Sequence, residues 1–172
     1  MKRKLKILYL GAYIESKGVW DLLKALKGVN FDYECNFYGE GILKQELKDY
    51  VKKNKLNVKI NYKTTHVSEV IDWHDVVVVP SIVPEAFGRV AIETMATGKI
   101  VLGRDRGGLG DIITNAKTGF LFNNWRELRL QLNILSFNKL LNPKVILKEA
   151  KKYSGETIAK KAIKIYKGVI KK

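Results

Sequence analysis

The sequence predicts an α/β fold, a Rossmann-like parallel sheet with helices on both faces. Three observations point to it: short apolar runs recur along the chain, segments of helical period separate them, and glycine or proline often follows a run. Parallel strands need such crossovers, and the crossover helices cover the faces of the sheet. The 172 residues suffice for one domain with a good core, and no linker or low-complexity segment divides them.

The expected elements alternate in order. Short apolar runs predict strands, which are expected over residues 6–10, 35–38, 58–62, 76–79 and 100–103. Amphipathic segments predict helices, which are expected over residues 20–29, 43–55, 67–72, 88–96 and 109–114. The chain is expected to be mainly helical after residues 119–122. Asn142 and Pro143 open one late helix, and Glu156 stands at the start of the last.

Composition narrows the function classes. The formal net charge is +15 and the pI is near 9.8, which favours an anionic partner. No apolar run approaches the roughly 18 residues of a membrane-spanning helix, and the basic start lacks a secretory apolar region, so we expect a cytoplasmic protein. The single cysteine, Cys35, excludes an intramolecular disulfide and a zinc cluster, and its strand pattern indicates a buried thiol.

The segment from Pro80 to Glu93 carries the clearest functional pattern. It follows the apolar run 76–79, so it lies where ligands bind in an open parallel sheet, at the carboxyl end of a strand. A helix beginning near Gly88 would offer free backbone N–H groups to a phosphate, and the glycine would allow a ligand to approach the backbone. Two carboxylates, Glu85 and Glu93, flank this anion site.

The spacing of the two carboxylates indicates what they could do. Eight residues of helix rise about 12 Å, whereas the paired carboxylates of glycoside hydrolases lie about 5–9.5 Å apart. Glu85 and Glu93 therefore suit hydroxyl groups at the two ends of a long phosphate-bearing ligand, such as a nucleotide sugar. The alternative is that Glu93 is a solvated helix residue and Glu85 an exposed acid that complements the helix dipole.

The same segment resembles the E-x7-E signature of retaining GT-B glycosyltransferases, most closely those of family 4 (group 1). Further motifs resemble this family and occur in its order. They are Gly11 to Gly18, Gly39-Glu40-Gly41, Asp75 to Ser81, Gly107 to Asp111, Thr118 to Leu121 and Tyr153 to Glu156. The resemblance covers nearly the whole chain, but only the C-terminal, donor-binding half of a GT-B enzyme. It implies one nucleotide-sugar-binding domain over residues 1–172, with an α/β core to about residue 137 and C-terminal helices from about 138.

The resemblance also implies residue roles. Glu85 would contact hydroxyls of the donor sugar, and Glu93 would hold the nucleotide ribose. Glu85 and Lys17 are the candidate catalytic residues, with Lys17 as a phosphate ligand. The remaining donor-binding candidates are Gly11, Phe87, Gly88, Arg89, Val90, Gly107 and Gly108. No obligatory metal or other cofactor is expected, because the helix dipole and cations would neutralise the diphosphate.

Two departures from the family pattern affect the expected site. The family usually carries an arginine after the first glycine of the phosphate loop, where this chain has Ala12. We hypothesise that Arg104, Arg106 or Arg89 compensates for it. Tyr62-Lys63 stands where the family tends to have a glycine, which leaves the nucleotide base open.

The expected function is donor binding in a retaining hexosyltransferase. Hexose would pass from a nucleoside-diphosphate sugar to an acceptor glycan or lipid-linked glycan, and a separate or missing acceptor domain would complete the enzyme. One alternative is a non-catalytic nucleotide-sugar-binding or regulatory subunit. Another is a basic nucleic-acid-binding protein, which the pI suits, although the aromatic residues are not interleaved with basic ones.

The C-terminal helix resembles the one that crosses to the first domain of a GT-B enzyme. Its apolar stripe comprises Ile158, Ala162, Ile165, Tyr166 and Val169. Residues 139–172 contain eleven lysines and two acids, so 11 − 2 = +9 of the formal charge lies there. This face is expected to fold back, to meet a partner, or to lie on an anionic membrane surface as a peripheral protein of the inner face.

Overall fold

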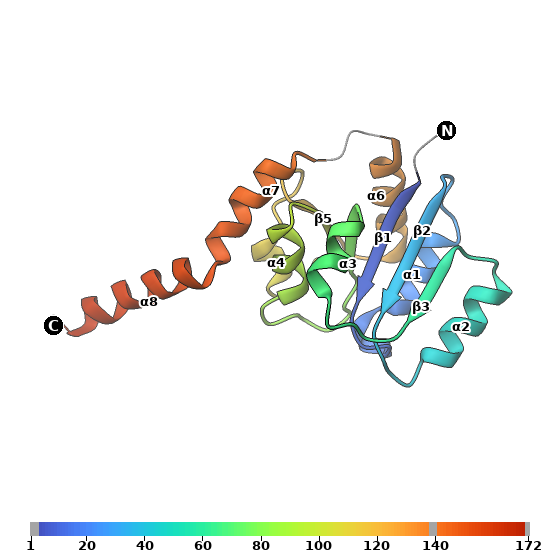
Figure 1. Ribbon diagram of the computed structural model, residues 1–172, viewed down its shortest axis with the longest axis horizontal. Helices are drawn as coiled ribbons and strands as arrows, with labels where there is room; N and C mark the ends of the chain where they lie inside the picture. The colour runs from blue at the N-terminus through green and yellow to red at the C-terminus, as the bar shows by residue number, and fades with distance from the viewer. Residues whose placement is uncertain (1–3, 138–140, 171–172) are drawn as a thin grey trace.

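Six parallel strands form one sheet, in the order β3-β2-β1-β4-β5-β6, within residues 4–137 and 141–170, which the computed structural model describes (Figure 1). The strands are β1 (Leu5–Leu10), β2 (Tyr33–Tyr38), β3 (Val58–Asn61), β4 (Val76–Val79), β5 (Ile100–Arg104) and β6 (Gly119–Phe122). The order reverses between β1 and β4, which is the topological switch point where open α/β sheets bind ligands. The predicted α/β class is confirmed.

Strand β6 was not among the expected strands. It is four residues long and pairs with β5, with Val101 opposite Gly119. A Cβ added at Gly119 would lie 1.8 Å from the carbonyl oxygen of Val101, so only glycine permits the pairing there. The partner strand and the reason for the glycine both depend on tertiary contacts, which these four residues do not specify by themselves.

The core lies against both faces of the sheet. All four valines of β4 are buried, as its continuous apolar run predicted. Leu8 and Val77 pack with Ile71 on one face, whereas Ile7 and Val78 belong to the larger cluster. The alternation along each strand follows from the two-residue period of side chains in β-structure.

Helices cover both faces, as predicted. They are α1 (Val19–Leu26), α2 (Lys44–Lys53), α3 (Val67–Trp73), α4 (Arg89–Ala96), α5 (Leu109–Ile112), α6 (Trp125–Phe137), α7 (Pro143–Ala150) and α8 (Gly155–Ile170). Two short 3-10 turns, η1 (Glu15–Lys17) and η2 (Lys151–Tyr153), complete the set. Helices α1 and α6 pack together behind the sheet as seen in Figure 1, and α3 and α4 lie in front of it.

Helix α7 starts where the sequence predicted. Asn142 is its N-cap, and the side-chain oxygen accepts a hydrogen bond from the backbone N–H of Lys144 at 3.0 Å. Pro143 occupies the first turn, where its missing N–H removes no helical bond. Ile146 and Ala150 are buried as α7 packs against α4.

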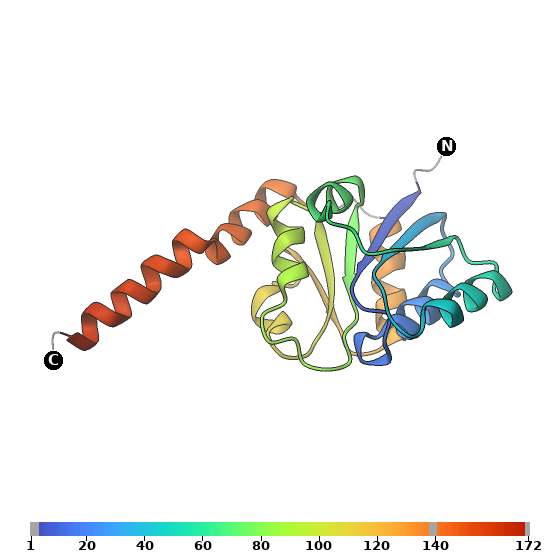
Figure 2. The ribbon, with the colours of Figure 1, turned by 60° about the horizontal axis from the view of Figure 1, so that its bottom comes forward.

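Helix α8 projects away from the rest of the molecule (Figures 1 and 2). Ile165 and Tyr166 of its apolar stripe are more than half exposed, so these positions of the stripe are not covered by the described residues. The side chain of Val169, which belongs to the predicted stripe, lies outside the described ones, as do Lys139, Lys171 and Lys172 of the basic segment. Among the described helices, none has the length and apolar character that a bilayer crossing requires.

Candidate functional site

Two adjoining cavities open at the carboxyl ends of the strands, at the switch point. The first has a volume of about 370 Å³ and is lined by Tyr9, Leu10, Gly11, Lys17, Val79, Pro80, Ser81, Glu85, Ala86, Phe87, Gly88, Arg89 and Val90. The second has a volume of about 550 Å³ and is lined by Leu10, Gly11, Ala12, Tyr38, Gly39, Glu40, Lys63, Thr64, Val67, Arg89, Val90 and Glu93. Four residues line both, so the two form one cleft beside α4.

The N-terminus of α4 faces the first cavity with unsatisfied donors. Ala91 and Ile92 donate their N–H groups to the carbonyl of Gly88, at 2.9 and 3.2 Å. The backbone N–H groups of residues 87–90 have no acceptor within the described parts of the chain. The first turn contains no acidic residue, and no side chain caps it. These donors and the helix dipole make this end a site for an anion.

Gly88, which lines the first cavity, is also required by its backbone conformation and its packing. Its φ of +62° lies in the left-handed region, where a side chain is strained. A Cβ at this position would come within 2.9 Å of Leu109 and 3.0 Å of Ile112, on α5. The glycine therefore lets the turn pack closely against α5.

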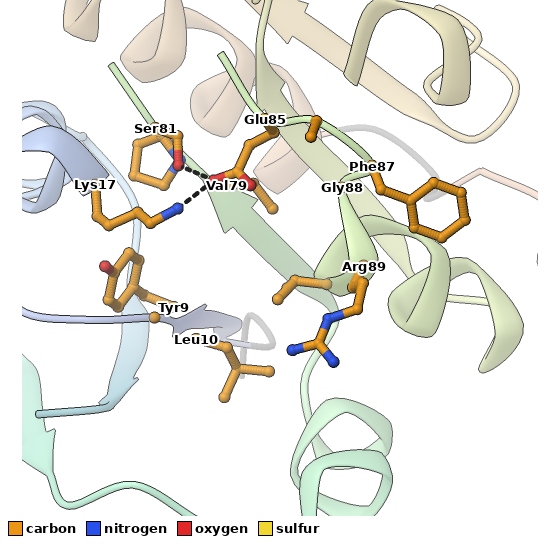
Figure 3. Close-up of a pocket in the computed structure, with 13 residues that line it drawn as sticks. Tyr9, Leu10, Lys17, Val79, Ser81, Glu85, Phe87, Gly88 and Arg89 are labelled. Carbon is orange, nitrogen blue, oxygen red and sulfur yellow. Dashed lines mark hydrogen bonds and ion pairs between the residues drawn. The ribbon is translucent and has the colours of Figure 1, made fainter. Parts of the chain in front are cut away.

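Glu85 and Lys17 meet across the first cavity (Figure 3). Lys17 ends η1 after β1, and Glu85 lies in the loop between β4 and α4. The Nζ of Lys17 is 2.6 Å from Oε1 of Glu85, and Ser81 donates its hydroxyl to the same oxygen at 2.5 Å. Partial burial opposes ionisation of Glu85, but the hydrogen bonds from Lys17 and Ser81 and the lysine charge outweigh it. The pKa of Glu85 is therefore lowered, and the carboxylate is charged at neutral pH.

Gly107 and Gly108 support the loop that carries Glu85. The N–H of Gly108 donates to the carbonyl of Glu85 at 2.7 Å, and Gly107 forms an isolated β-bridge with Glu85. A Cβ on Gly107 would lie 2.7 Å from that carbonyl oxygen, and its φ of +58° also requires glycine. Gly108 is the N-cap of α5, as its expected place at the start of a short helix implied. Neither glycine lines the two cavities, and both contact the backbone of Glu85.

Glu93 lies one turn further along α4 and lines the second cavity. It is exposed and has no hydrogen-bond or ion-pair partner in the described part of the chain. On the rim of the same cavity, Lys63 is 3.7 Å from Glu40. The expected donor-binding residues did not include Glu40, Lys63 or Thr64, although Glu40 belongs to a family motif and Lys63 was noted in connection with the base. Their positions just after two predicted strands are the signal that could have found them.

The three candidate compensating arginines differ in their surroundings. Arg104 is 6% exposed, pairs with Asp21, and donates to the carbonyls of Pro80 and Asn123 at 3.1 and 3.2 Å. This corrects the expectation for Arg104, because its donors are taken up in the protein interior. Arg106 is exposed and lines neither cavity. Arg89 lines both cavities and has no acidic partner among the described residues.

Tyr9 is a lining residue that the sequence did not reveal. Its hydroxyl donates to the carbonyl of Ala12 at 2.7 Å, and its ring is almost fully buried. Burial is the main reason that the pKa of Tyr9 lies far above its usual value, with smaller contributions from Tyr13 and Glu85. Tyr9 therefore stays protonated and holds the loop that begins at Gly11.

Neither histidine lines the two cavities. His74 is buried, with Nε2 3.0 Å from the amide of Asn36 and Nδ1 2.6 Å from the carbonyl of Val70. Burial lowers the pKa of His74, so the neutral form predominates at pH 7. His66 precedes α3 and lies 3.3 Å from Glu69. Across the described residues, no three His, Cys, Asp or Glu side chains gather as a metal site would require.

The chain matches a known family over most of its length. The family described as "Glycosyl transferases group 1" matches residues 1–154. An uncharacterized glycosyltransferase of Methanocaldococcus jannaschii is 32% identical over 152 residues, covering 86% of this chain and 42% of that protein. A glycogen synthase of Thermodesulfovibrio yellowstonii is 26% identical over 177 residues, covering 95% of this chain and 35% of that protein.

A solved structure shows the same fold. Anabaena HepE in complex with UDP and glucose has a TM-score of 0.85 and 20% sequence identity, covering 96% of this chain and 48% of that one. This likeness shows the fold as that of the GT-B glycosyltransferase structures. The chain spans less than half the length of each of these relatives, in agreement with the resemblance to one GT-B half.

Proposed function

The chain belongs to the group 1 glycosyl transferases, and from this premise we propose that it is the donor-binding domain of a retaining hexosyltransferase. The donor would be a nucleoside-diphosphate sugar. The observation that carries the proposal is the cleft at the switch point, where free N–H groups of α4, Lys17 and two glutamates line adjoining cavities. Each feature matches one part of such a ligand.

The first cavity suits the diphosphate and the sugar. The donors at the start of α4 and the nearby Arg89 favour phosphate oxygens, and Lys17 adds a flexible point charge. Glu85 is a charged acceptor for sugar hydroxyls. UDP and glucose accompany the structurally similar HepE, which is consistent with a ligand of this kind here.

The second cavity suits the nucleoside. Its wall includes Leu10, Val67 and Val90, against which a base could pack, and Glu93 stands where a ribose could donate its hydroxyls. The base itself would reach the rim formed by Glu40 and Lys63. We therefore assign Glu93 to the ribose and leave the choice of base to experiment.

In the proposed reaction, the bond between the sugar and the diphosphate breaks, and the oxygen of an acceptor hydroxyl bonds to the sugar with retained configuration. The proton of that hydroxyl passes to the departing diphosphate or to solvent. Charge grows on the departing diphosphate as the bond breaks. The N–H groups of residues 87–90 and the Lys17 ammonium would stabilise that charge, and such fixed donors are commonly the largest electrostatic contribution to catalysis. No metal is required by this scheme.

Calorimetric titration tests the donor site. Wild-type protein is titrated with UDP, GDP and ADP, and the titrations are repeated with Glu93→Ala and with Glu46→Ala. Glu46 is an exposed glutamate of the first turn of α2, so it matches Glu93 in type but lines neither cavity. One nucleotide should bind, and only Glu93→Ala should weaken it. Absence of binding by all three nucleotides, or equal effects of the two substitutions, would contradict the proposal.

The proposed partner in catalysis is an acceptor-binding domain, on another subunit or another part of a longer protein. Alone, the chain should bind the donor and transfer little sugar. Robust transfer to a defined acceptor by these 172 residues would contradict this. If the chain binds the donor but transfers no sugar even when an acceptor domain is added, the alternative of a non-catalytic subunit is favoured.

Helix α8 is proposed to lie on an anionic membrane surface. Ile158, Ile165 and Tyr166 of the apolar stripe are exposed, and lysines stand at 160, 161, 164 and 167. A basic amphipathic helix binds such a surface by burying its apolar face beside anionic headgroups. Flotation with anionic and with neutral liposomes tests it. The protein should float with the anionic liposomes alone, and its absence from both would contradict the proposal.

A further inference from the structure

We infer that the ion pair between Lys17 and Glu85 makes the first cavity selective for a nucleoside diphosphate whose terminal phosphate carries a hydroxyl-bearing group over the same nucleoside diphosphate without that group. This inference rests on the proposed donor site and adds a selection between ligands within it. The inference follows from which groups donate hydrogen bonds to each of the two carboxylate oxygens of Glu85.

The pair joins two walls of the cavity through a single carboxylate oxygen. Lys17 comes from the segment after β1 and Glu85 from the segment after β4, and their side-chain atoms are 2.6 Å apart. Ser81, which is 2% exposed, donates to the same Oε1 atom at 2.5 Å. Within the described residues, Oε2 of Glu85 has no hydrogen-bond partner. Ser81 thus anchors the carboxylate while the second oxygen stays available to the cavity (Figure 3).

The lysine charge is therefore already engaged when an anion arrives. Three cations line the cleft: Lys17 contacts Glu85, Lys63 is near Glu40, and Arg89 has no acidic partner in the described parts of the chain. Arg89 and the α4 donors can meet a phosphate directly. Lys17 can join them only if the phosphate draws it from Glu85.

The cost of that exchange depends on what else the ligand offers. The Glu85 side chain is 22% exposed, so loss of a charged donor leaves a partly buried carboxylate short of partners. The free terminal phosphate of a nucleoside diphosphate offers Glu85 only acceptor oxygens and negative charge, and it cannot replace the lysine. A hydroxyl-bearing group can donate to Glu85, which offsets the loss.

This arrangement also gives a direction to ligand exchange. Sugar transfer would convert a ligand that satisfies Glu85 into one that does not. Once the sugar has left, the return of Lys17 to Glu85 favours release of the diphosphate. The pair thus favours replacement of a spent ligand by a fresh one.

Paired titrations of variants test the inference. The probes are UDP with UDP-glucose, GDP with GDP-mannose, and ADP with ADP-glucose, measured by calorimetry on wild-type protein, Glu85→Gln and Glu93→Gln. Each variant removes one negative charge from the cleft, but only Glu85 contacts Lys17. In Glu85→Gln the bare diphosphate should bind about fivefold more tightly, because Lys17 is released, while the sugar conjugate should gain nothing. In Glu93→Gln the ratio between conjugate and diphosphate should equal that of wild type.

The outcomes separate this inference from the donor site. An unchanged ratio in Glu85→Gln, or weaker binding of its diphosphate, would overturn the inference and leave the donor site standing. Binding of no probe to wild type would overturn the donor site and the inference together. A readout without ligand checks the pair itself: NMR titration of the Glu85 carboxyl should give a higher pKa in Lys17→Met than in wild type. An equal pKa in the two proteins would also overturn the inference.

Discussion

The cleft beside α4 and the projecting helix α8 both carry positive charge, yet they hold it differently. In the cleft, Lys17 reaches across a cavity to Glu85, a residue 68 positions away in the chain. On α8, Lys160 pairs with Glu156 of the same helix at 2.5 Å, and both side chains are about three-quarters exposed. The comparison of these two ion pairs shows that the net charge of +15 does not indicate where on the molecule a ligand binds. A charged side chain can favour one ligand over another where tertiary contacts hold it at a defined position.

The backbone shows the same contrast at two glycines, and the largest expected effect comes from them. Gly18 has a φ of +69°, and a Cβ there would lie 1.9 Å from the carbonyl oxygen of Pro80. Left-handed strain and overpacking should together make Gly18→Ala roughly 3–4 kcal/mol less stable to unfolding. At Gly155, at the start of α8, nothing lies within 4 Å of an added Cβ, so Gly155→Ala should be tolerated. Urea unfolding measures both. Similar losses of unfolding free energy in the two variants would contradict the proposed difference between the cleft and α8.

A second comparison sets a buried ion pair against an exposed one. Arg104→Ala leaves Asp21 partly buried without its cation and should cost about 3 kcal/mol in unfolding free energy. Lys160→Ala, on α8, should leave stability unchanged, because solvent already screens its pair. Thermal or urea unfolding of the two variants checks this. Since Arg104 lines neither cavity, nucleotide affinity of folded Arg104→Ala should equal that of wild type, and a loss would restore it as a ligand contact.

A third comparison removes the same charge from each region. Lys17→Met should weaken binding of a nucleoside-diphosphate sugar about tenfold, because a charged donor to the phosphates is lost. Lys164→Met, on an exposed face of α8, should leave the affinity unchanged. Calorimetric affinities of the two variants distinguish a direct contact of Lys17 with the ligand from long-range attraction by the net positive charge of the protein. Equal losses of affinity in the two variants would indicate long-range attraction by the net charge and would contradict a direct contact of Lys17.

The smallest expected effect is a pH dependence confined to the cleft. The pKa of Glu85 is lowered in the folded protein, so its stabilising contribution is present above the usual glutamate pKa of about 4.3. It is lost as pH falls through the lower, folded value. The stability difference between wild type and Glu85→Gln should be about 0.5 kcal/mol at neutral pH, because solvent screens a partly exposed pair, and should vanish in acid. Urea unfolding of both proteins at several pH values measures this stability difference. A difference that persists in acid would show that the carboxylate charge is not its source.

Local patterns sufficed for much of the fold. The valine run 76–79 predicted β4, and Asn142-Pro143 predicted the start of α7, because burial on both faces and helix capping depend on adjacent residues. The segment containing Glu85 and Glu93 could be placed at the start of a helix for the same reason. Their positions beside two cavities then followed from the rule that open parallel sheets bind ligands at the carboxyl ends of strands.

The sequence by itself determined the α/β class, the place of the site helix and the residue types that face an anion, since each depends on periodicity or on near neighbours. Only the tertiary structure decided which distant groups meet. It paired Lys17 with Glu85, and it committed Arg104 to Asp21, 83 positions away, rather than to the cleft. It also added β6 to the sheet. These contacts depend on strand order and packing, because neither partner's local sequence carries information about the other.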